Sequence, residues 1–147
     1  MGWSHLHPAL VHFVVGLGTI LLLWDIKRLR FPYEPARCDR PFALISEGWI
    51  GLVLLGVGTG WLALATDALL QHGGAEIYLG SVHGKMGILV LGLATARVLG
   101  GPAPKPPGLR RFWTGFDIGL LLLLSGTALL GEWLVFRMGL GVSGITL

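Results

Sequence analysis

Four apolar runs, each long enough to cross a membrane, constrain this chain more than any other feature. They span residues 6–24, 42–65, 78–99 and 112–136. A helix needs about 20 apolar residues to cross the hydrocarbon core of a bilayer. Because lipid offers no partner for an unpaired backbone group, each run is expected to be helical. The sequence therefore predicts an all-α integral membrane protein, a four-helix bundle of two tandem helical hairpins, with one domain over residues 1–147.

The charged residues indicate how such a bundle is oriented. Only 13% of the residues are charged, against about 25% in soluble domains. Of the 11 lysines and arginines, nine lie in two places, after the first run (Lys27, Arg28, Arg30, Arg37, Arg40) and at or beyond the end of the third (Arg97, Lys105, Arg110, Arg111). Basic segments beside membrane helices are typical of the cytoplasmic side. We therefore expect a bacterial inner-membrane protein with both termini outside, and no nucleic-acid partner.

Two stretches of the chain resemble each other at an offset of 71 residues. Val11-His12 stands four residues before Gly16, and Val82-His83 stands four residues before Gly87. Glu47 with Asp117, and Gly58-Thr59 with Gly126-Thr127, repeat at nearly the same offset. The pattern predicts two hairpins of the same orientation. His12 and His83 are then expected to lie at one level of the membrane and to face each other across the bundle.

The histidines, all five of which are expected on the outer side, allow three hypotheses. His12 and His83 hydrogen-bond neighbouring helices and bind nothing; or they are the axial ligands of one b-type haem; or they hold a bare zinc, copper or iron ion. Neutral imidazole is a good metal ligand. In the third hypothesis His7 joins them, with help from Asp67 or Glu132, because three imidazoles and an open position suit zinc.

The haem hypothesis assigns roles to several neighbours. His7 is a reserve or supporting group, and Lys85 and Arg137 are charge partners for the propionates. Gly80, Gly84 and Gly87 would let a porphyrin approach the backbone. The chain has no Cys-x-x-Cys-His for covalent attachment. A second haem would need histidines near the inner ends of the runs, and none is present there. The sequence therefore predicts at most one haem.

Other polar residues inside the runs are fewer. Glu47 and Asp117 are expected near the inner side, where they reach the interface, pair with arginines of the loops, or form a proton site or an entrance for a quinone. Trp49 and Trp61 are expected to pack inside the bundle. No sequence pattern of a hydrolase or a phosphate-binding loop is present.

The segment His7-Pro8-Ala9-Leu10-Val11-His12-Phe13 resembles the opening His-Pro-x-x-Val-His-Phe of a bacterial family of four-span membrane proteins, domain of unknown function 2231. Weaker similarities follow at Thr59-Gly60, at Ala65-Thr66-Asp67, at His83 and over residues 131–139. Glu132 departs from the family pattern, and Met138 stands near a position that is often histidine, where it could serve as a thioether ligand. The resemblance implies four spans and draws attention to His7, His12 and His83, but it supplies no reaction.

Together these features predict a membrane electron-transfer subunit, not an enzyme on its own. One b-type haem near the outer face would relay electrons between a membrane donor such as quinol and a periplasmic redox protein. One alternative is a non-catalytic subunit that scaffolds a larger respiratory or photosynthetic membrane complex. Another is an outward-facing site for a zinc, copper or iron ion.

Overall fold

The computed structural model describes residues 6–30, 39–69, 74–100 and 106–138, which form four long helices. These are α1 (Leu6–Arg30), α2 (Asp39–Leu69), α3 (Gly74–Leu99) and α4 (Pro107–Met138). Each contains a segment long and apolar enough to cross a membrane: Ala9–Arg30, Leu44–Leu62, Tyr78–Leu99 and Pro107–Arg137. The predicted all-α membrane bundle is confirmed.

The helices extend beyond the apolar runs that predicted them. Helix α1 continues to Arg30, and α4 begins at Pro107, a residue type that needs no hydrogen-bond partner for its nitrogen at a helix start. Helix α1 begins at Leu6. His7 therefore lies within the first turn of this helix.

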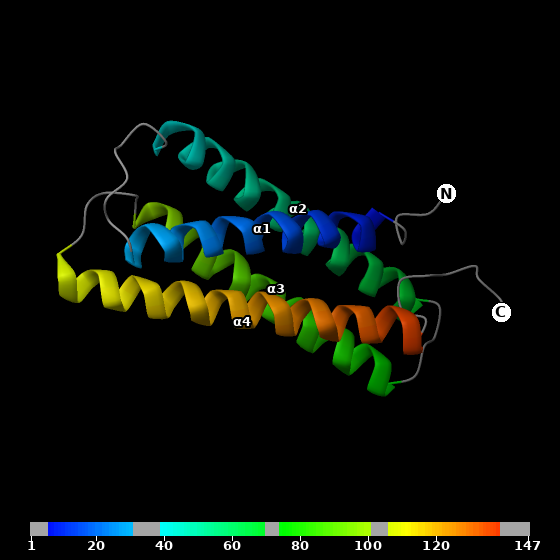
Figure 1. The fold of residues 1–147 in the computed structure, drawn as a ribbon. Coiled ribbons are helices and arrows are strands. Elements are labelled where there is room, and N and C mark those ends of the chain that lie inside the picture. Colours follow the sequence, from blue (N-terminus) through cyan, green and yellow to red (C-terminus); the bar gives the residue numbers. More distant parts are fainter. Residues whose placement is uncertain (1–5, 31–38, 70–73, 101–105, 139–147) are drawn as a thin grey trace.

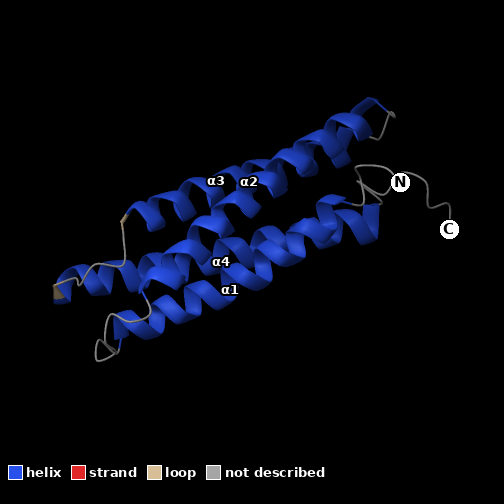
Figure 2. Cartoon of the chain, turned by 90° about the horizontal axis from the view of Figure 1, so that it is seen from above, coloured by secondary structure: helices blue, strands red, loops and turns tan. Residues whose placement is uncertain are grey.

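The helices pack in a ring, with successive helices antiparallel (Figure 1). Helices α1 and α3 each pack along α2 and α4, and only long side chains connect α1 to α3, so these two helices lie diagonally across the bundle. Helix α1 lies beside α4 (Figure 2). We call the end where α1 and α3 begin the histidine end, because His7 and His83 lie there. The opposite end, with Arg30, Arg97 and Arg110, is the arginine end.

Close packing of Trp49 against Gly18 joins α1 to α2. Trp49 is only 2% exposed, and its indole N–H donates a hydrogen bond to the backbone carbonyl of Val14 at 2.8 Å. A Cβ atom added to Gly18 would lie 2.6 Å from the indole. Glycine at position 18 therefore lets the two helices approach closely. The expectation that Trp49 packs inside the bundle is confirmed.

A buried cluster of charges joins three helices at the arginine end. Arg97 of α3 pairs with Asp25 of α1, and its Nε lies 2.6 Å from Oδ1 of Asp117 in α4. Its guanidinium also lies 4.9 Å from the ring centre of Trp113. Asp117 is fully buried, whereas Glu47 is exposed. Asp117 thus pairs with an arginine, as one of the alternatives predicted, although that arginine lies within a helix. Charges inside membrane spans require such partners.

Replacing Gly18 with alanine tests the role of close packing. The added methyl group would overlap the Trp49 indole, so Gly18→Ala should lower the free energy of unfolding by about 1–3 kcal/mol. Gly16→Ala is the matched control, because nothing lies within 4 Å of a Cβ at that position. Reversible unfolding in mixed detergent micelles would compare the two. Equal stability of the two variants would contradict this description of the α1–α2 contact.

Candidate functional site

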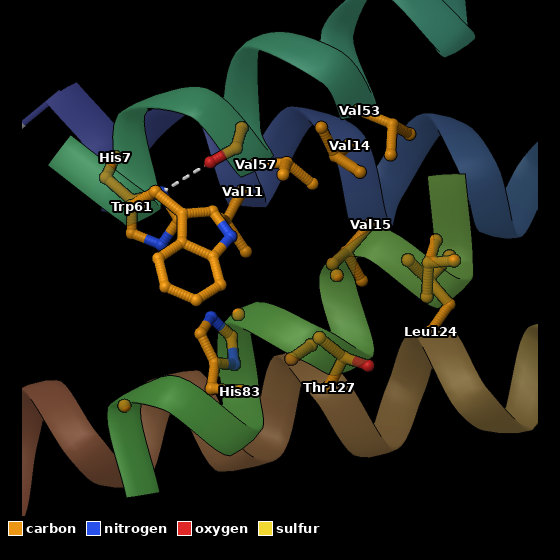
Figure 3. A pocket seen from close by; sticks show the side chains of 17 residues that line it. His7, Val11, Val14, Val15, Val53, Val57, Trp61, His83, Leu124 and Thr127 are labelled. Atoms are coloured by element: carbon orange, nitrogen blue, oxygen red, sulfur yellow. Dashed lines mark hydrogen bonds between the residues drawn. The ribbon is translucent and has the colours of Figure 1, made fainter. Parts of the chain in front are cut away.

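A cavity of about 70 Å³ lies inside the histidine end of the bundle. All four helices contribute to its wall, which consists mainly of valine and glycine (Figure 3). Among the residues that line it, the polar side chains are those of His7, His83, Thr127 and the indole of Trp61. The site is therefore an apolar chamber containing two imidazoles.

His7 reaches the cavity from α1 and is fixed by α2. Its Nδ1 lies 3.0 Å from the carbonyl oxygen of Gly56, a contact drawn dashed in Figure 3, and 3.3 Å from the Thr59 hydroxyl. Because a carbonyl can only accept, Nδ1 carries the proton and Nε2 carries the lone pair. A Cβ atom on Gly60 would lie 2.8 Å from the imidazole. A histidine whose Nδ1–H is held by a carbonyl in this way can bind a metal through Nε2.

His83 occupies the corresponding place on α3 and is supported by α4. A Cβ atom on Gly131 would lie 2.7 Å from its ring. The backbone of Thr127 interacts with the ring, but Nδ1 is buried and makes no hydrogen bond of acceptable geometry. A buried nitrogen without a partner is uncommon in folded proteins and costs stability.

The two imidazoles lie at a separation that one metal ion could bridge. Their ring centres are 6.0 Å apart and their planes are inclined by 80°. Two imidazole nitrogens that share one metal ion each lie about 2 Å from it, which puts the ring centres about 6 Å apart. The pair comes from diagonally opposite helices, so it spans the centre of the bundle.

The positions of His7 and His83 also show that the internal repeat does not have one offset throughout the chain. His7 and His83 are 76 residues apart, whereas the glycines beneath them, Gly60 and Gly131, are 71 apart. The buried residues follow the same two offsets: Val14 and Gly18 correspond to Val90 and Ala94, and Trp49 and Val53 correspond to Leu120 and Leu124. The connection in the first hairpin is therefore five residues longer than in the second.

His12 does not face His83, contrary to the expectation from the sequence. Its side chain is exposed on the outside of the bundle and does not line the cavity. In the corrected register its counterpart is Ile88, which is also exposed. The sequence had matched two Val-His pairs that lie on different faces of their helices.

The other predicted site residues lie apart from the cavity or outside the described set. Lys85, Glu132 and Arg137 are exposed and do not line it. In the part of the chain that the structure describes, no group of three or more His, Cys, Asp or Glu residues could hold a metal ion. The predicted cluster of His7, His12 and His83 therefore does not assemble. His5, His72 and the side chains of Asp67 and Met138 lie outside the described residues.

Trp61 forms one wall of the cavity, a role that the sequence did not reveal. Its indole lies beside the imidazoles, and a Cβ atom on Gly84 would lie 3.1 Å from it (Figure 3). Gly80, Gly84 and Gly87, the glycines that the haem hypothesis singled out, also line the cavity. The cavity has room for a few water molecules but not for a whole porphyrin. Trp61 is 37% exposed, so this wall of the cavity reaches the outer surface of the bundle.

These features define a membrane protein with four candidate spans and a pair of histidines in an apolar cavity. The chain matches the family described as "Predicted membrane protein (DUF2231)" over residues 4–144, and it belongs to that family. The resemblance seen in the sequence is thereby confirmed. Neither the curated proteins nor the solved structures include a match to this chain.

Alanine at either supporting glycine should displace an imidazole. Gly60→Ala should shift the NMR signals of the His7 ring, and Gly131→Ala those of the His83 ring, because each methyl group would lie under 3 Å from a ring atom. Gly58→Ala is the matched control, since nothing lies within 4 Å of a Cβ there. The His12 signal should stay in place in all three variants. Unchanged His7 and His83 signals would show that the glycines do not position the rings.

Proposed function

We propose that this protein is a membrane electron-transfer subunit in which His7 and His83 bind the iron of one b-type haem. The observation that carries the proposal is the 6.0 Å separation of two imidazoles from opposite helices. Two imidazoles at this separation could both hold a single iron. The bound haem would supply one-electron chemistry, and the chain would supply its ligands and surroundings.

The surroundings of the two imidazoles support this assignment. The Gly56 carbonyl holds the proton of His7 on Nδ1, which leaves Nε2 for the iron. Gly60 and Gly131 keep both rings from moving back into α2 and α4. The wall around the two imidazoles consists mainly of valine and glycine. The cavity is smaller than the macrocycle, so haem binding would require the helices around the two histidines, and the indole of Trp61, to move apart.

The direction of the bundle follows from its basic residues. We propose that the arginine end faces the cytoplasm, because Lys27, Arg28 and Arg30 end α1 there. The histidine end then faces the periplasm of a bacterial inner membrane. Electrons would pass between a membrane donor such as quinol and a periplasmic redox protein or a neighbouring subunit. Lys85 and Arg137, exposed toward that end, are the candidate partners for the haem propionates.

An absorption spectrum of the purified protein tests the proposal. The wild type should show a Soret band and, on reduction, a sharp α band. His7→Ala and His83→Ala should each abolish the low-spin spectrum, because each removes one ligand. His12→Ala should keep it, because the His12 side chain is exposed and outside the cavity.

The alternatives give different results in the same experiment. A colourless protein with stoichiometric zinc, copper or iron would indicate a bare-ion site. A colourless, metal-free protein that co-purifies with other subunits would indicate a scaffold. Loss of the spectrum in His12→Ala but not in His7→Ala would reject the assigned ligand pair.

A further inference from the structure

Three arginines, Arg30, Arg110 and Arg111, lie at the arginine end, where α1 ends and the neighbouring α4 begins. Asp25 of α1 and Asp117 of α4 share Arg97, which fixes the relative height of the two helices. Arg30 lies five residues beyond Asp25, and Arg111 lies six residues before Asp117. At 1.5 Å per residue, both lie about 7 to 9 Å further toward the arginine end. Arg110 adds a third guanidinium at the same height.

The charges of these arginines are not neutralised within the described chain. Arg30 and Arg111 are exposed and Arg110 is half-buried. Asp25 and Asp117, the acids of α1 and α4 near the arginine end, are already bound to Arg97. Among the described residues, no carboxylate pairs with any of the three. The result is a concentration of positive charge at one membrane surface.

Apolar stripes lead from the two exposed arginines toward the centre of the membrane. Leu23 precedes Arg30 by seven residues, and Ile118 follows Arg111 by seven. Seven residues make two helical turns, so each pair shares a helix face. Leu23 is 53% exposed and Ile118 is 45% exposed. Each arginine is thus the polar end of a surface whose remainder faces acyl chains.

We propose that Arg30, Arg110 and Arg111 bind the phosphate of an anionic phospholipid in the leaflet at the arginine end. Guanidinium groups bind phosphate through paired hydrogen bonds. Basic pockets between membrane helices hold anionic headgroups. The apolar stripes favour a lipid over a soluble phosphate, because a lipid gains contacts along both helices. This site is separate from the histidine cavity and does not depend on what that cavity binds.

Lipid binding to the delipidated full chain, measured by native mass spectrometry in a neutral detergent, tests the proposal. Phosphatidylglycerol should bind more tightly than phosphatidylcholine of the same chain length. Arg30→Gln combined with Arg111→Gln should weaken phosphatidylglycerol binding about tenfold or more, since each basic group contributes to the attraction. Binding of phosphatidylcholine should not change. Inorganic phosphate in excess should not displace the lipid.

Two further variants keep the test decisive. Lys85→Gln combined with Arg137→Gln removes the same charge at the histidine end and should leave the lipid preference unchanged. Arg30→Lys combined with Arg111→Lys preserves charge but not paired hydrogen bonding, and should give an intermediate loss even if the glutamine variant fails to fold. An unchanged preference in the variants at 30 and 111, an equal loss in the control, or displacement by phosphate would each overturn the proposal.

Discussion

Large rings packed directly on glycines hold this bundle together. Five such contacts occur among the described residues: Trp49 on Gly18, His7 on Gly60, Trp61 on Gly84, His83 on Gly131 and Trp113 on Gly100. In a membrane, lipid is as apolar as the helix surfaces, so helices associate through close packing and not through hydrophobic burial. A Cβ atom at any of these glycines would lie between 2.5 and 3.1 Å from the ring. The helices could then not keep their present separation.

The same packing of a ring on a glycine positions the two histidines. Each imidazole comes from the first helix of its hairpin and lies on a glycine of the second, so the two hairpins present equivalent rings at one level. Their diagonal placement directs the rings toward the centre. The charged cluster around Arg97 lies at the other end of the bundle. The cavity therefore remains apolar, and a metal held there would be surrounded mainly by valine and glycine, an environment that disfavours net charge.

The sequence predicted the four spans, because hydropathy alone decides which segments can cross a bilayer. It did not predict how far the helices continue into the basic segments. The histidine pair was harder to predict than the spans. The repeated Val-His pair suggested one offset for the whole chain, and it obscured the better match between residues 14–19 and 90–95. That match has an offset of 76 residues, which pairs His7 with His83. It requires the connection in the first hairpin to be longer than that in the second. The positions of Gly60 beneath His7 and of Trp61 in the wall arise from contacts between helices, which no local pattern reveals.

Whether His7 and His83 hold one iron together is tested by the electron paramagnetic resonance spectrum of the oxidised protein. The two rings lie 6.0 Å apart on diagonally opposite helices, and two imidazole ligands would make the iron low-spin. We expect a low-spin ferric signal in the wild type and its loss in His7→Ala and in His83→Ala. A high-spin signal in the wild type, or a low-spin signal that persists in either variant, would contradict this assignment.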